Sequence, residues 1–119
     1  MRTVLIVDDE PKICRILKSF FELRGYHAIT TTSGQEALAA VQDQLPNYVL
    51  LDVRMPDMSG LDVLRQLKSE RPELPVIMVT AVEDHQTEET AMALGASDYI
   101  LKPFTFEEPA WARAFFADL

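Results

Sequence analysis

The stretch VLIVDDEP, residues 4–11, places two adjacent aspartates directly after a run of four apolar residues. A continuous apolar run is typical of a strand that is buried on both faces of a parallel sheet. Three later runs also end at a polar side chain: Tyr48–Leu51 precedes Asp52, Val76–Val79 precedes Thr80, and Tyr99–Leu101 precedes Lys102. Because ligands of open α/β sheets bind where the carboxyl ends of the strands meet, we expect these side chains to gather there.

Strand-like and helix-like patterns alternate five times along the chain. Apolar residues from Ile13 to Phe20 follow the spacing of one helix face, and that helix is expected to end at Gly25. The threonine-rich segment Tyr26–Thr32 alternates in polarity and predicts an edge strand. Alternating units of this kind predict an α/β fold with a parallel sheet and helices on both of its faces.

Local signals set expectations for three of the helices. Ser33 and Glu36 form a capping-box pattern at the start of the second helix. Residues 83–94 predict a fourth helix that is polar over its first eight residues, so we expect it to pack loosely and to be the moving element. The last helix is expected to start at Thr105 or Glu107.

Composition limits the class of protein. The chain has 119 residues, a net charge of −8 and one cysteine, Cys14. This length suits a single domain, residues 1–119, with a core of its own. The acidic balance argues against direct nucleic-acid binding, and no apolar run approaches the ~18 residues of a membrane span. A lone cysteine and an N-terminus without a signal-peptide pattern predict a cytoplasmic protein.

Asp8, Asp9 and Asp52 would bring three carboxylates to one edge of the sheet. Adjacent carboxylates repel each other unless a cation sits between them, and ligation by oxygen alone favours Mg²⁺ or Mn²⁺ over Zn²⁺. An alternative stays open, in which Asp9 merely caps the first helix and Pro11 lies in its first turn. The loop after Asp52 is too long for a tight cap, which favours exposure of that carboxylate toward a ligand.

No lysine or arginine occurs between Arg71 and Lys102, so Lys102 stands alone in an acidic stretch. Pro103 follows it and ends the strand. Thr80 by itself says little, since threonine is common in strands, but the small Ala81 beside it leaves access to the hydroxyl. Three acids, a hydroxyl and an amine at one sheet edge describe a site for Mg²⁺ and a phosphoryl group.

Four motifs, in this order and at these spacings, resemble the receiver domain of bacterial two-component response regulators across nearly the whole chain. They are VDDEP at 7–11, LLDVRMPDMSG at 50–60, TA at 80–81 and DYILKPF at 98–104. The resemblance implies a flavodoxin-like sheet of five parallel strands in the order 2-1-3-4-5. It also implies a signalling phosphoacceptor rather than an enzyme, with only self-phosphotransfer and autodephosphorylation expected.

The resemblance implies a role for each residue at the site. Asp52 resembles the phosphoacceptor and is a further metal ligand. Asp9 is similar to the direct metal ligand, with Asp8 acting mainly through water, and the backbone carbonyl of Arg54 is similar to the third protein ligand. The set therefore implies a Mg²⁺ cofactor, with Mn²⁺ as a substitute.

A second set of roles concerns the response to phosphorylation. Thr80 corresponds to the hydroxyl that turns toward the phosphoryl group, Lys102 to the amine that pairs with it, and Tyr99 to the switching aromatic. The Lys102–Pro103 bond corresponds to one that is usually cis in the family. The implied partners are a histidine kinase or phosphotransfer protein as donor and an output domain or partner protein that reads the surface of residues 83–104.

The sequence RMPDMSGLDVLRQLK, residues 54–68, resembles receivers joined to transcriptional output domains. Whether the chain stands alone or is part of a larger regulator stays open. A phosphorylation-independent interaction module on the same fold is an alternative, and the intact set of acids, hydroxyl and amine argues against it. A flavodoxin-like cofactor binder would need a phosphate loop rich in Ser, Thr or Gly, whereas Asp8-Asp9-Glu10-Pro11 would repel a phosphate.

The last sixteen positions depart from the family pattern, with Pro109 and Arg113 where aliphatic residues are usual. They hold half of the ten aromatic residues of the chain: Phe104, Phe106, Trp111, Phe115 and Phe116. One interpretation is a repacked core helix that starts late, with Pro109 in its first turn. The other is an exposed apolar stripe of Trp111, Phe115 and Leu119 that serves a partner or a homodimer strengthened by phosphorylation.

Overall fold

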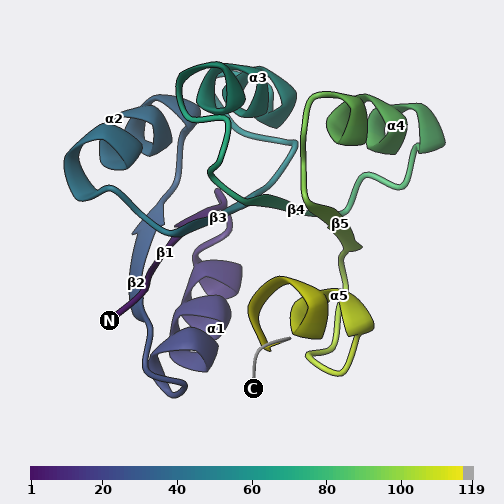
Figure 1. The fold of residues 1–119 in the computed structure, drawn as a ribbon. Helices are drawn as coiled ribbons and strands as arrows, with labels where there is room; N and C mark the ends of the chain where they lie inside the picture. Colours follow the sequence, from purple (N-terminus) through teal and green to yellow (C-terminus); the bar gives the residue numbers. More distant parts are fainter. Residues whose placement is uncertain (117–119) are drawn as a thin grey trace.

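A computed structural model describes residues 1–116 of the chain and contains one sheet of five parallel strands in the order β2-β1-β3-β4-β5. The strands are β1 (Thr3–Val7), β2 (His27–Thr31), β3 (Tyr48–Leu51), β4 (Val76–Thr80) and β5 (Asp98–Leu101). The helices are α1 (Pro11–Glu22), α2 (Gly34–Gln44), α3 (Gly60–Glu70), α4 (His85–Ala93) and α5 (Pro109–Trp111), which continues as a π-helix over Ala112–Phe116. Figure 1 shows α2, α3 and α4 along one face of the sheet and α1 with α5 along the other. The predicted fold and strand order are confirmed.

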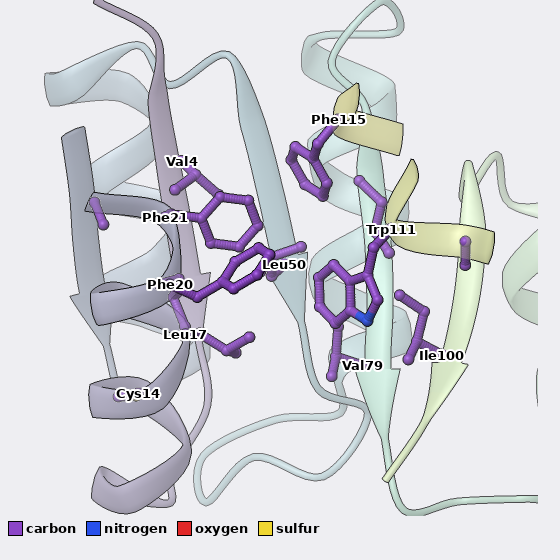
Figure 2. Packing of buried hydrophobic residues seen from close by; sticks show 14 residues of the cluster. Val4, Cys14, Leu17, Phe20, Phe21, Leu50, Val79, Ile100, Trp111 and Phe115 are labelled. Carbon is purple, nitrogen blue, oxygen red and sulfur yellow. The ribbon is translucent and has the colours of Figure 1, made fainter. Parts of the chain in front are cut away.

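Each face of the sheet has its own apolar core. Side chains alternate across a strand, so Val4 and Ile6 of β1 pack toward α1 and α5, whereas Leu5 and Val7 pack toward α2 and α3. Figure 2 shows the first of these cores. Burial on both faces explains why the central strands are continuous apolar runs. No helix within residues 1–116 is long and apolar enough to span a bilayer.

The N-terminal cap of α2 differs from the predicted capping box in one hydrogen bond. Ser33 Oγ accepts a hydrogen bond from the Glu36 N–H, as the capping-box pattern predicts. The Glu36 carboxylate, however, accepts from the N–H and the hydroxyl of Thr32 rather than from the N–H of Ser33. Thr32 offers two donors to one oxygen, which explains the shift by one residue.

Helix α4 is as weakly anchored as its polar sequence predicts. All its residues are described, and among them Ala91 alone is buried. Its first turn is capped by Asp84, whose carboxylate accepts from the Gln86 N–H and from the Thr87 hydroxyl. Few buried contacts make a helix the element most easily displaced.

The last helix starts later than expected. It begins at Pro109, with Glu108 as an extended N-cap, so a start at Thr105 or Glu107 is wrong. Proline disfavours helical backbone at the residue before it, which excludes a helix that runs through residue 108. Trp111 is fully buried and Phe115 is nearly so, which confirms the core-helix interpretation. The exposed-stripe interpretation is wrong for these two residues, and Leu119 lies outside the described residues.

Candidate functional site

The ends of the strands bring the acidic residues together at one edge of the sheet. Asp8, Asp9 and Glu10 follow β1, and Asp52 follows β3. One carboxylate oxygen from each of these four residues lies within 4.8 Å of the others. The three aspartates are those that the sequence predicts. Glu10 was missed, although its place directly after the pair was a signal that could have included it.

Lys102 lies at the centre of this cluster rather than on the surface. Its side chain is only 8% exposed, and Nζ lies 2.7 Å from Asp8 Oδ2, 2.8 Å from Asp52 Oδ2 and 3.0 Å from Glu10 Oε1. Burial alone lowers the pKa of Lys102, but the hydrogen bonds to Asp52, Asp8 and Glu10 outweigh it and raise that pKa. These contacts therefore favour the charged ammonium form of Lys102.

Asp8 is buried at the base of the cluster. Its Oδ1 accepts from the Glu10 N–H at 2.9 Å, and the thiol of Cys14 donates to its backbone carbonyl. Burial raises the pKa of Asp8 in spite of the opposing effects of Lys102 and the Glu10 amide. One ammonium cannot compensate several carboxylates, so the cluster keeps an excess of negative charge that a divalent cation would neutralise.

Asp9 does not cap the first helix. The N-cap of α1 is Glu10, no side chain caps it, and Pro11 occupies the first turn. The capping alternative is therefore wrong. The Asp9 carboxylate is exposed and makes no hydrogen bond within residues 1–116, which leaves its oxygens open to a ligand.

Asp52 is held from both sides. Oδ1 accepts from the Arg54 N–H at 3.2 Å, and Oδ2 faces Lys102. Its side chain is 6% exposed, less than the long following loop predicts, because these two donors cover its oxygens. Gly60 at the start of α3 packs directly on the backbone of Asp52, where any Cβ would overlap the Asp52 carbonyl. This close approach fixes the end of β3 against α3.

Thr80 and Tyr99 both contact Val82, in the loop between β4 and α4. The Thr80 hydroxyl is fully buried and accepts from the Val82 N–H at 3.3 Å. The Tyr99 hydroxyl donates to the Val82 carbonyl at 2.6 Å. The Lys102 N–H also donates to the Thr80 carbonyl, and the Lys102–Pro103 bond is cis, as the resemblance implies. Val82 thus connects the Thr80 hydroxyl to Tyr99, the predicted switching aromatic, and no sequence pattern indicates this connection.

Comparison with known proteins agrees with this geometry. The family model of the response regulator receiver domain matches residues 4–110. This chain belongs to that family. The receiver is 43% identical over 106 residues to the probable transcriptional regulatory protein TcrX of Mycobacterium tuberculosis, covering 89% of this chain and 45% of that protein. It is 43% identical over 108 residues to the transcriptional regulatory protein KdpE of the same organism, covering 91% and 47%. It therefore spans less than half the length of these relatives.

Solved structures share its fold. A CheY-like receiver domain from Methanospirillum hungatei matches with a TM-score of 0.90 and 29% identity, covering 96% of this chain and 91% of that one. The response regulator TrrA of Thermotoga maritima, solved in complex with Mg²⁺ and BeF, matches with a TM-score of 0.85 and 32% identity, covering 96% and 97%. The present receiver thus shares its fold with a protein that was solved with Mg²⁺ and BeF, and it has a cluster of four acids at one edge of its sheet.

Proposed function

We propose that this receiver, residues 1–119, accepts a phosphoryl group on Asp52 from a histidine kinase or phosphotransfer protein. The reaction depends on Mg²⁺, and the surface of residues 83–104 responds by controlling an output domain or partner protein. The observation that carries the proposal is the contact of Lys102 with Asp52 inside a cluster of four carboxylates. It places a fixed positive charge beside the one buried acid at the end of β3.

The donor set suits Mg²⁺, because it consists of oxygens and carries an excess of negative charge. Asp9 and Asp52 would bind the ion directly, with Asp8 acting mainly through water and the backbone carbonyl of Arg54 as the third protein ligand. Mn²⁺ would serve in its place. A bound divalent ion would supply the positive charge that lets an anionic phosphodonor approach these acids.

The chain's own residues would carry the transfer. An oxygen of Asp52 attacks the phosphorus in line, the bond between phosphorus and the donor atom breaks, and the leaving group departs from the opposite side. Lys102 stays charged, and its ammonium group can form an ion pair with the oxygens of the phosphoryl group on Asp52. A contact between an ammonium and a phosphoryl oxygen at about 4 Å is on the order of 4 kcal/mol at an effective dielectric constant of 20.

The switch follows from the shared contacts of Val82. When the Thr80 hydroxyl turns toward a phosphoryl oxygen, it gives up the Val82 N–H and releases the loop that Tyr99 also holds. A hydrogen bond to a charged oxygen contributes ~1.5–3 kcal/mol, and shifting a two-state equilibrium from 1:99 to 99:1 needs about 5.5 kcal/mol. Lys102 already contacts Asp52 before phosphorylation, so only the part of its interaction that is gained with the phosphoryl oxygens counts toward this shift, together with the new bond of Thr80. The weakly anchored α4 is the element that these contacts would displace.

The receiver would act in the cytoplasm as a signalling protein, with autodephosphorylation as its remaining chemistry. Its output would be transcriptional, as the names of its relatives suggest. The net charge of −8 argues against direct contact with nucleic acid. Homodimerisation on phosphorylation stays a prediction. It was based on an exposed apolar stripe, but Trp111 and Phe115 of that stripe are buried. The intact cluster argues against a phosphorylation-independent module.

Incubation with Mg²⁺ and acetyl phosphate tests the proposal. We expect the protein to gain one phosphoryl group that is stable in acid and labile in base, followed by intact-mass spectrometry. Chelation of the metal with EDTA should prevent the gain, because the carboxylates would then repel the donor. Labelling at the same level in EDTA, or labelling that survives base, would show that the site does not work as proposed.

Replacement of Thr80 separates transfer from signal. The Thr80→Ala variant should still bind Mg²⁺, since Thr80 is no ligand, but should lose the change in hydrogen exchange across residues 83–104 that beryllofluoride, a phosphoryl mimic, induces in the wild type. Thr80→Ser keeps the hydroxyl and is the matched control, with a response like the wild type. A full response in Thr80→Ala would contradict this account of the switch.

A further inference from the structure

A side chain of the loop between β3 and α3 binds the start of another helix. Asp57 Oδ1 accepts from the Gly34 N–H at 2.8 Å, and Asp57 Oδ2 accepts from the Gln35 N–H at 3.0 Å. These are first-turn N–H groups of α2, which have no partner within the helix. The two bonds lower the pKa of Asp57, with the bond from Gly34 as the larger cause. Asp57 therefore joins two loops that lie more than 20 residues apart in sequence.

The neighbour of Asp57 strengthens this connection. The Met58 side chain packs against Gly34 in the space that a side chain at position 34 would occupy. A Cβ at Gly34 would overlap Met58 and Val63. Two successive residues of the β3–α3 loop thus anchor it to the start of α2, one through hydrogen bonds and one through packing.

The two segments that this anchor joins are each connected along the backbone to one half of the acid cluster. The β2–α2 segment is fixed on the Asp8 side, because Thr31 at the end of β2 accepts a hydrogen bond from the Asp8 N–H at 3.1 Å. Asp52 itself is fixed by the sheet, since its N–H donates to the Val7 carbonyl. Beyond Asp52 the chain leaves the sheet. There the Arg54 N–H donates to Asp52 Oδ1, the Gly60 N–H donates to the Val53 carbonyl, and residues 54 and 59 form an isolated bridge. These contacts hold the two ends of the loop, whereas Asp57 and Met58 hold its middle against the start of α2.

We infer that Asp57 is a positioning residue of the phosphorylation site, which holds the β3–α3 loop so that the Arg54 carbonyl is in place to bind Mg²⁺. The inference rests on the proposed function, because it concerns the same metal site. A ligand that is already ordered binds more tightly than one that binding must order. Release of the loop should therefore weaken Mg²⁺ binding, while Asp52 stays in place.

The competing explanation is that Asp57 only caps α2 and contributes to stability. Ser33 separates the two, because its hydroxyl caps the same helix through the Glu36 N–H and has no bond to the β3–α3 loop. If capping alone matters, Ser33→Ala and Asp57→Ala should behave alike, with lower unfolding midpoints and unchanged Mg²⁺ affinity. If Asp57 positions the loop, only Asp57→Ala should weaken Mg²⁺ binding.

The test is titration of the whole protein with MgCl₂ by isothermal calorimetry, for the wild type, Asp57→Ala, Asp57→Asn and Ser33→Ala. We expect Asp57→Ala to raise the Mg²⁺ Kd roughly tenfold, the lower end of the loss seen when the support of a metal ligand is removed. Asp57→Asn keeps one acceptor oxygen and should recover part of the affinity, whereas Ser33→Ala should bind like the wild type. Hydrogen exchange should quicken at Gly34 and Gln35 in Asp57→Ala and at Glu36 in Ser33→Ala.

The outcomes distinguish this inference from the function on which it rests. A wild type that binds no Mg²⁺ would overturn the proposed function and this inference with it. A wild type that binds Mg²⁺, together with an Asp57→Ala variant of equal affinity and faster exchange at Gly34, would overturn the positioning role alone. Equal weakening by Asp57→Ala and Ser33→Ala would do the same, because it would assign the effect to the cap of α2.

Discussion

Replacement of Asp52 by Asn is expected to abolish phosphoryl incorporation from acetyl phosphate. The amide has nearly the shape of the carboxylate and can still accept from the Arg54 N–H, so the loop should keep its structure. It carries no charge, however, and its oxygen is a far weaker nucleophile, so no bond to phosphorus can form. Intact-mass spectrometry in the presence of Mg²⁺ should find none of the variant labelled when the wild type has gained one group.

A matched exchange on α3 controls for the loss of one charge. Asp62 is exposed, pairs with Arg65 on the helix surface and is not one of the four acids of the cluster, so Asp62→Asn should be labelled like the wild type. Labelling of Asp52→Asn at the wild-type level would remove Asp52 as the acceptor and direct attention to the other carboxylates of the cluster.

The sequence is informative about the fold because strands that are buried on both faces of the sheet consist of continuous apolar runs. Each of the four runs that end at a polar residue became a strand in the expected place. The order of the strands was available only through the family resemblance, since no local pattern records which strand pairs with which. Pro109 was the sequence signal for the start of α5, because proline restricts the residue before it, yet Thr105 and Glu107 suggested an earlier start.

The site was predictable as a set of residues but not as a set of contacts. Strand ends point to Asp8, Asp52 and Lys102, and the structure joins these three in ion pairs. The contacts of Val82 and Asp57 were not predictable, because they depend on the paths of two loops. A carboxylate in a loop is most often a turn former or a cap, so only the three-dimensional path distinguishes a cap of its own segment from a cap of another helix.

Replacement of Trp111 by Ala is expected to cause a larger loss of stability than the substitutions in the site. The indole is fully buried, and the rings of Phe20, Phe21, Phe104 and Phe106 lie around it. Figure 2 shows it beside Phe20 of α1 and next to Val79 and Ile100 of the sheet. Its removal takes a large apolar surface from the core and leaves a cavity, which costs about 3–5 kcal/mol. Urea unfolding followed by circular dichroism should show the midpoint falling with little change in slope.

Two further variants decide what Trp111 contributes. The indole Nε1–H has no hydrogen-bond partner among residues 1–116, so Trp111→Phe removes an unpaired donor along with some packing and should destabilise much less than Trp111→Ala. Leu23 is 84% exposed, and Leu23→Ala should change the free energy of unfolding by no more than about 0.5 kcal/mol. If Trp111→Ala were as mild as Leu23→Ala, the aromatic helix would not be part of the core. Its stripe would again be open to a partner or a second copy of the chain, and the Trp111 emission of the wild type would then shift with protein concentration instead of staying constant.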